Sequence, residues 1–326
     1  MHDRFLLLFA MLAPAALLVW SEGKPMPEAK GGAAAALLGH ELILAGGTTW
    51  REGRKLWLAD VDIYDIGRAD WRKGPRLPSP LAYAPALATA TGIEIYGGSD
   101  GSRTLRECLR FDAASGAWRP IGRLPEARVL GRAERFSDSV YYIGGASDVN
   151  DLSHTFDTVL RRRSQTGDWE RVAAMPDGGR AMLATTSLNG RMYLFGGCYV
   201  NSSGKLVNVA DARVFEPATG AWKRLHDLPR ATRGQSAVAA DDHRIFLFGG
   251  YTASEEEAKS HGPEFGFSAD VLIYETTTDR YTQLEPMPLA VIGMDFFRTE
   301  NLFLGAGGEH RSRARTARLL TARFSD

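Results

Sequence analysis

Polar and charged side chains follow several of the Gly-Gly pairs in this sequence, and these are the residues whose types could do chemistry. They are Arg51, Asp100, Arg103, Asp148, Asn150, Asn201, Lys205, Glu264, Glu309 and Arg315. A carboxylate can take up and return a proton, and an arginine can bind an anion through its planar guanidinium. This set predicts acid–base chemistry on a small anionic ligand.

Residues for other chemistries are not arranged in a usable way. The sequence has no Ser-His-Asp motif, phosphate-binding glycine loop, HExxH or CxxC, and its seven histidines are scattered. Cys108 and Cys198 fall in different repeat units, so we expect no disulfide. The 39 basic residues balance 39 acidic ones, which argues against a nucleic-acid binder. We therefore expect neither a metal site nor a cofactor.

A repeat of about 50 residues organises the chain. Six short apolar runs end in Gly-Gly, and the second glycines are Gly47, Gly98, Gly145, Gly197, Gly250 and Gly308. Most pairs are followed by a Trp or Tyr and then by Leu-Pro or Met-Pro, with prolines at 78, 125, 176, 229 and 288. Strand-like units with this period are typical of a kelch-type β-propeller. The sequence thus predicts an all-β, six-bladed kelch-type β-propeller.

The outer strand of the sixth blade is expected at the other terminus. No aromatic residue with Leu-Pro follows Gly308, but Trp20 and Met26-Pro27 match the spacing of Trp71 and Leu77-Pro78. Residues 17–20 should therefore complete the last blade, so that the N-terminal strand closes the ring and removes exposed sheet edges. One propeller should span residues 16–326.

The apolar N-terminus has two interpretations. Residues 5–20 carry no charge, but this run is short for a membrane span, which needs roughly 20 residues. Ala13-Pro14-Ala15 resembles a signal-peptide cleavage site. We expect residues 1–15 to be a signal peptide and the protein to be exported, to the periplasm. The alternative is a buried strand that starts the domain.

A propeller's default ligand site is the mouth of its central channel. The loops after Gly-Gly and the crossings after Leu-Pro should both emerge there, which makes Arg51, Arg103, Asn201 and Arg180 candidates for binding an anionic ligand. Arg128, Arg230 and Arg233 also lie on crossings. The alternative for each crossing arginine is a structural role that ties the loop to the adjacent blade.

Several segments resemble a known family. Residues 30–47, 55–65, 77–83, 195–204 and 212–222 look like blades of the cyclically permuted mutarotases, kelch propellers related to the bacterial N-acetylneuraminate epimerase (sialic acid mutarotase). The resemblance covers essentially the whole chain, with the blade order rotated. The last blade carries its most specific motif, because Glu309 follows a glycine and Arg315 comes six residues later.

The resemblance implies that Glu309 and Arg315 are catalytic. Mutarotation opens a cyclic hemiketal and recloses it on the other face, so it needs a base and a proton source. An arginine could clamp the sugar-acid carboxylate. Two departures from the family pattern are the Gly-Ala-Gly-Gly turn before Glu309 and the extra Arg311 and Arg313. The implied substrate is a small anionic sugar, N-acetylneuraminate. The alternative is a non-catalytic kelch module that binds a glycan or a protein.

Overall fold

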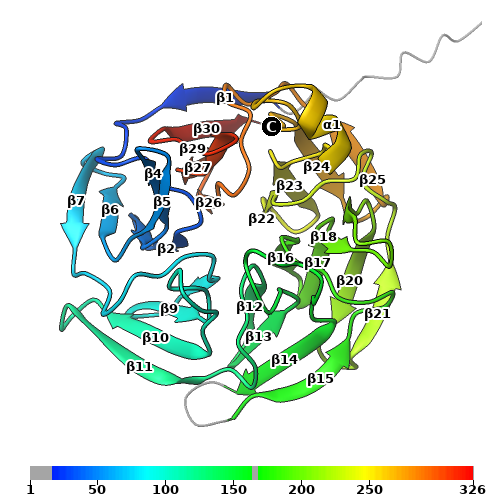
Figure 1. The fold of residues 1–326 in the computed structure, drawn as a ribbon, viewed down its shortest axis with the longest axis horizontal. Helices are drawn as coiled ribbons and strands as arrows, with labels where there is room; N and C mark the ends of the chain where they lie inside the picture. Colours follow the sequence, from blue (N-terminus) through cyan, green and yellow to red (C-terminus); the bar gives the residue numbers. More distant parts are fainter. Residues whose placement is uncertain (1–16, 164–167, 326) are drawn as a thin grey trace, which may run out of the picture.

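The computed structural model describes residues 17–163 and 168–325, and these form a ring of six four-stranded antiparallel blades around a central channel (Figure 1). The predicted all-β, six-bladed propeller is confirmed. The first strand of each blade faces the channel and the fourth lies on the outer rim (Figure 1). The predicted signal peptide, residues 1–15, lies outside the described residues.

The strands of the first three blades follow chain order, apart from one added hairpin. Blade 1 contains β2 (Ala34–Leu38), β3 (Glu41–Ala45), β6 (Val61–Asp65) and β7 (Asp70–Gly74). Blade 2 contains β8 (Ala86–Ala88), β9 (Gly92–Tyr96), β10 (Glu107–Asp112) and β11 (Ala117–Arg123). Blade 3 contains β12 (Arg132–Phe136), β13 (Ser139–Ile143), β14 (Thr158–Arg163) and β15 (Glu170–Ala174). The added hairpin of blade 1 pairs β4 (Thr48–Arg51) with β5 (Arg54–Trp57).

The last three blades carry the other insertions. Blade 4 contains β16 (Ala184–Leu188), β17 (Arg191–Phe195), β20 (Ala212–Glu216) and β21 (Ala221–Arg224), with the added hairpin β18 (Cys198–Val200) and β19 (Leu206–Asn208). Blade 5 contains β22 (Ser236–Ala239), β23 (Arg244–Phe248), β24 (Val271–Glu275) and β25 (Arg280–Gln283), with helix α1 (Glu255–Ser260). Blade 6 contains β26 (Phe296–Thr299), β27 (Leu302–Ala306), β30 (Leu319–Ser325) and β1 (Leu17–Glu22), with the added hairpin β28 (Glu309–Arg311) and β29 (Ala314–Arg315).

The N-terminal strand closes the ring as predicted. β1 pairs antiparallel with β30, with Trp20 opposite Ala322. The Trp20 ring packs edge-on against Phe248 of blade 5 and Phe296 of blade 6, with centroid distances of 6.1 and 6.0 Å. Closure therefore rests on a backbone ladder and on aromatic packing between two blades.

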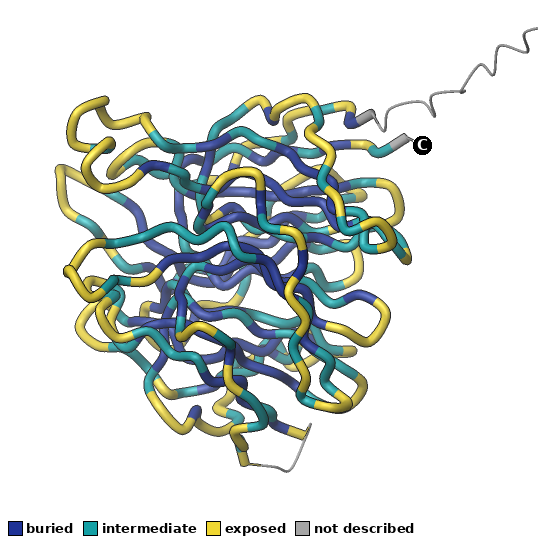
Figure 2. The backbone as a smooth tube through the Cα atoms, turned by 90° about the vertical axis from the view of Figure 1, so that its right-hand side faces the viewer, coloured by how far each residue is buried: buried dark blue, intermediate teal, exposed yellow. Residues whose placement is uncertain are grey.

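The apolar second strands form the buried cores between blades. Figure 2 shows buried backbone through the middle of the molecule and exposed loops around it. Phe246 and Phe303, on the second strands of blades 5 and 6, lie 4.8 Å apart by ring centroid. Each Gly-Gly pair follows such a strand and has positive φ at both glycines. A Cβ on Gly46 would lie 2.1 Å from the carbonyl oxygen of Leu81, so the close approach of the crossing requires glycine here.

A series of backbone hydrogen bonds links the blades around the channel. It runs through Gly32, Tyr83, Leu130, Met182, Gly234 and Gly293, one residue from each blade entry and all with positive φ. Each later N–H donates to the carbonyl of the preceding member, at 2.7 to 3.1 Å. These bonds hold the six blade entries at fixed positions, and so they set the width of the channel mouth.

Candidate active site at the channel mouth

Glu309 and Arg315 lie directly opposite each other on the β28–β29 hairpin. The residue after each Gly-Gly pair forms a β-bridge with the crossing that enters its blade, and the six such residues are Thr48, Ser99, Ala146, Cys198, Tyr251 and Glu309. Glu309 is the one carboxylate in this set. The β-bridge between Glu309 and Ile292 fixes the backbone position of Glu309. The backbone N–H of Arg313 donates a hydrogen bond to Glu309 Oε1 at 2.9 Å.

The Arg315 guanidinium joins three blades. It forms an ion pair with Glu309 of its own hairpin. Its Nη2 donates to Thr48 Oγ1 of blade 1 at 2.9 Å and to Tyr83 Oη of blade 2 at 3.0 Å. Only 6% of the side chain is exposed. Arg315 is therefore an integral part of the wall and not the tip of a mobile loop.

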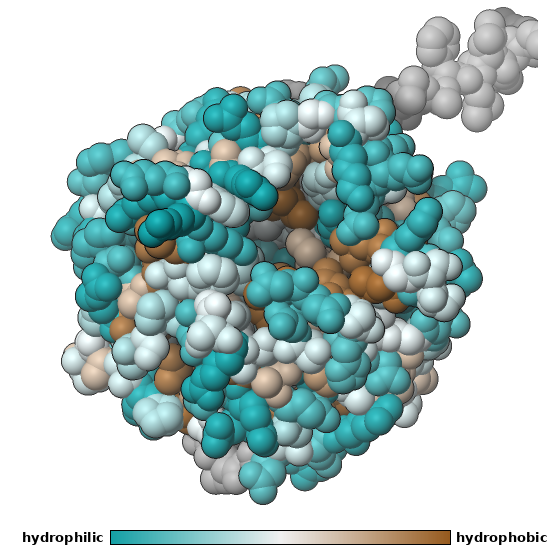
Figure 3. Space-filling model, in the orientation of Figure 1, coloured by the Kyte–Doolittle hydropathy of each residue, from teal (hydrophilic) through white to brown (hydrophobic). Residues whose placement is uncertain are grey.

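These residues line a pocket at the centre of one face of the ring. Figure 3 shows the hollow there, bordered on one side by hydrophobic residues. The empty space within it is about 730 Å³, which includes the part open to solvent. Its lining residues are Gly31, Gly32, Ala33, Tyr83, Ala84, Pro85, Leu130, Gly131, Arg132, Met182, Gly234, Ile292, Gly293, Asp295, Glu309 and Arg315.

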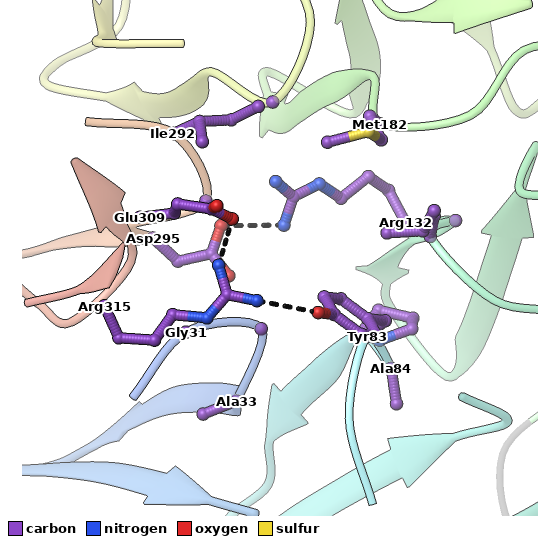
Figure 4. Close-up of a pocket in the computed structure, with 16 residues that line it drawn as sticks. Gly31, Ala33, Tyr83, Ala84, Arg132, Met182, Ile292, Asp295, Glu309 and Arg315 are labelled. Atoms are coloured by element: carbon purple, nitrogen blue, oxygen red, sulfur yellow. Dashed lines mark hydrogen bonds and ion pairs between the residues drawn. The ribbon is translucent and has the colours of Figure 1, made fainter. Parts of the chain in front are cut away.

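A second ion pair crosses the pocket floor (Figure 4). Arg132 of blade 3 and Asp295 of blade 6 are 2.7 Å apart, Nη1 to Oδ1. Both also line a second cavity deeper in the channel, together with Glu134. Burial raises the pKa of Glu134, although the hydroxyls of Thr185 and Ser187 donate to its carboxylate at 2.7 and 2.6 Å. The pocket therefore combines two carboxylates with two guanidinium groups, and the Glu134 carboxyl, whose pKa is raised by burial, lies below them.

Four other residues predicted to bind substrate do not line this pocket. Arg51 and Arg103 are well exposed and pair with Glu28 and Asp100, respectively. The Asn201 side chain accepts hydrogen bonds from the N–H groups of Ser203 and Lys205, so it shapes its own turn.

Arg180 is the fourth, and it is buried. It donates to the carbonyl of Gly196 at 3.2 Å and pairs with Asp211 at 2.7 Å. Its contacts match the alternative raised for a crossing arginine, which is to tie the crossing to the next blade.

Tyr83, Arg132 and Asp295 are pocket residues that the sequence analysis did not single out. A signal for two of them is present in the repeat. In each blade, one residue at or beside the start of the first strand follows the crossing proline by seven positions, or by eight in blade 4. These six residues are Ala34, Pro85, Arg132, Ala184, Ser236 and Asp295. Only Arg132 and Asp295 in this set are charged. Their charges are opposite, and they come from blades 3 and 6, on opposite sides of the ring.

No pocket residue belongs to a metal-binding cluster in the described ranges. The one group of three potential ligands found there, Asp241, Asp242 and His243, lies on the turn between β22 and β23. Asp241 accepts from the N–H groups of His243 and Arg244, as expected for a turn. Cys108 and Cys198 are both buried free thiols.

Comparison with known proteins points to one enzyme family. A family model for N-acetylneuraminate epimerase matches residues 153–258. The N-acetylneuraminate epimerase of Haemophilus influenzae (strain PittEE) is 25% identical over 227 residues, which cover 62% of this chain and 59% of that protein. The resemblance predicted from the sequence is confirmed. This chain is similar to the N-acetylneuraminate epimerases.

The share of this chain that is matched differs between relatives. The epimerase of Pasteurella multocida (strain Pm70) is 30% identical over 129 residues, or 39% of this chain and 32% of that protein. Kelch-like protein 11 of Mus musculus is 23% identical over 64% of this chain and 28% of that protein. The chain thus spans less than two thirds of the length of these relatives. The family-model match ends before Glu309 and Arg315.

Helices contribute little to the described part of the chain. None of them is both long and apolar enough to cross a membrane.

Proposed function

We propose that this protein is a sugar-acid mutarotase that interconverts the anomers of N-acetylneuraminate. The observation that carries the proposal is the Glu309–Arg315 pair, which faces a pocket at the channel mouth. These two residues match the spacing expected for the epimerases, and the epimerase relatives supply the substrate class.

Glu309 is the proton acceptor in this proposal. Its carboxylate takes the proton of the anomeric hydroxyl as the ring C–O bond breaks and a carbonyl forms. Arg315 holds the carboxylate toward the pocket, and Arg313 fixes its other oxygen through a backbone N–H. The base is therefore positioned before the sugar binds, which removes part of the ordering cost.

Tyr83 is the proton donor to the ring oxygen. Its hydroxyl lies 3.0 Å from Arg315 Nη2, so a developing phenolate would face a permanent cation. After ring opening, rotation about the bond next to the new carbonyl presents its other face. Reclosure then reverses both steps, because Glu309 returns its proton to the carbonyl oxygen and Tyr83 recovers one from the attacking hydroxyl.

Anomer exchange tests this function directly. Freshly dissolved crystalline N-acetylneuraminate starts as one anomer, and NMR follows the appearance of the other with and without the protein. Faster exchange that scales with protein concentration is the expected result. An unchanged rate, together with measurable sugar binding, would favour the second candidate, a non-catalytic binding module, to which the kelch-like relatives point.

We also propose that the protein acts after export, in the periplasm. The support is the apolar segment and the Ala13-Pro14-Ala15 motif in the sequence. Cleavage after Ala15 would leave β1, which begins at Leu17, able to close blade 6.

A further inference from the structure

The hydrogen-bonding capacity of Arg315 is largely used within the protein. Its Nε and Nη2 donate to Thr48 Oγ1, Nη2 also donates to Tyr83, and Nη1 pairs with Glu309. With 6% of its side chain exposed, it has little surface left for a ligand. A sugar acid in this pocket therefore needs another cation for its carboxylate.

Arg132 is placed to supply that cation. It begins β12 on the side of the pocket opposite Glu309, and its guanidinium points across the floor (Figure 4). Its Nε donates to the carbonyl of Leu183 at 2.9 Å, and its Nη2 to the carbonyl of Gln235 at 3.4 Å. These carbonyls belong to neighbouring blade entries, so the guanidinium keeps its position without Asp295.

Asp295 occupies the position that a ligand carboxylate would take. Its carboxylate accepts a 2.7 Å hydrogen bond from Arg132 and forms an ion pair with it. It is 26% exposed, and it borders both the upper pocket and the second cavity below. An incoming carboxylate could therefore take its place on Arg132 while Asp295 turns toward the deeper cavity and remains solvated.

We propose that Arg132 binds the carboxylate of the sugar acid and that Asp295 is the resting counterion that the substrate displaces. This inference rests on the proposed function and names the group that recognises the acid. Exchange of one carboxylate for another keeps the Arg132 guanidinium paired, so the cost of a buried unpaired charge does not arise. Arg132 would also orient the sugar, because its carboxylate and its anomeric hydroxyl are on the same carbon.

The test compares two ligands and three variants. The ligands are N-acetylneuraminate and its methyl ester, which has the same ring but no carboxylate charge. The variants are Arg132→Met, Asp295→Asn and a charge-matched control, Arg54→Met, an exposed residue of the β4–β5 hairpin that does not line the pocket. Calorimetry gives the dissociation constants, NMR gives the anomer exchange rates, and thermal melting shows that each variant is folded.

The two pocket variants should act in opposite directions. Arg132→Met should weaken binding of the acid about 10- to 100-fold, the worth of a hydrogen bond to a charged group, and leave binding of the ester nearly unchanged. Asp295→Asn should tighten binding of the acid severalfold, because it removes the competitor for Arg132. Arg54→Met should bind both ligands as the wild type does.

A structural role of the pair predicts a different pattern. Equal losses for acid and ester in Arg132→Met, or weaker acid binding in Asp295→Asn, would overturn the assignment while leaving the mutarotase function in place. If Arg132→Met did not fold, the Asp295→Asn result would decide. A wild type that neither binds N-acetylneuraminate nor speeds its anomer exchange would overturn the proposed function and this inference with it.

Discussion

Replacing Glu309 by glutamine is the sharpest test of the proposed chemistry. The amide keeps the shape of the side chain but cannot accept the anomeric proton. We expect the rate of anomer exchange to fall about 10²–10⁴-fold, the usual worth of a positioned general base. Sugar binding should change far less, because the variant retains Arg315, Tyr83 and Arg132.

The structure also sets the expected cost in stability. Glu309 accepts from the Arg313 N–H through one oxygen and from Arg315 through the other. Glutamine has only one oxygen, so its amino group must face one of these two donors. The loss of one such hydrogen bond costs about 1–3 kcal/mol, toward the lower end here because the Glu309 side chain is 26% exposed. The variant should therefore remain folded, with a melting temperature lowered by a few degrees.

The assay pairs NMR anomer exchange with a melting curve for each protein. Glu256→Gln on α1 is the matched control, since it makes the same chemical change at a site 90% exposed and outside the pocket. Exchange in Glu309→Gln at the wild-type rate, in a folded protein, would remove Glu309 from the mechanism.

Four further outcomes are expected. Tyr83→Phe should slow NMR anomer exchange about 10²-fold or more if the phenol is the proton donor, and an unchanged rate would assign the donor elsewhere. Trp20→Ala should lower the free energy of unfolding by about 3 kcal/mol, which is near the low end for a core tryptophan because this side chain is only partly buried. Denaturant titration measures this free energy, and a loss below about 1 kcal/mol would contradict the role of Trp20 in closing the ring. Burial raises the pKa of the Glu134 carboxyl in the folded state, so this carboxyl binds more protons there than in the unfolded chain. The stabilising contribution of Glu134 should therefore fall as the pH rises above 4.5, the ordinary pKa of a glutamate. The difference in melting temperature between the wild type and Glu134→Gln, measured from pH 4 to about 8, should change accordingly, and parallel curves would refute the shift. N-terminal sequencing of the exported protein should begin at Ala16, whereas an intact Met1 would reject cleavage.

The fold follows from the sequence because its signals are local and repeated. Gly47 and its equivalents mark the turn after a buried strand, and the aromatic residue and Leu-Pro mark the rim strand and the crossing. Six copies of one pattern average out the irregularities of any single blade. Closure of the ring was also predictable, because the sixth blade has no outer strand after Gly308 and the segment around Trp20 matches the spacing of the outer strands of the other blades.

The site was only partly predictable, for a geometric reason. Glu309 and Arg315 are six residues apart on one hairpin, so sequence spacing alone places them side by side. Arg132 and Asp295 are 163 positions apart and meet only because their strands face each other across the ring. Arg180 illustrates the opposite case, since no local pattern distinguishes an arginine that lines a channel from one that ties a crossing to a blade.

Pairing of β1 with β30 has a consequence for the protein during synthesis. Trp20 leaves the ribosome about 300 residues before its partner Ala322, and at roughly 5–20 residues per second this interval is roughly 15–60 s. Throughout that time the nascent chain has an open sheet edge that can pair with other chains. The hairpin that carries Glu309 emerges only at the end of the same interval, so a truncated translation product would contain most of the blades but no proton acceptor. Catalytic competence and a closed ring would then be acquired together.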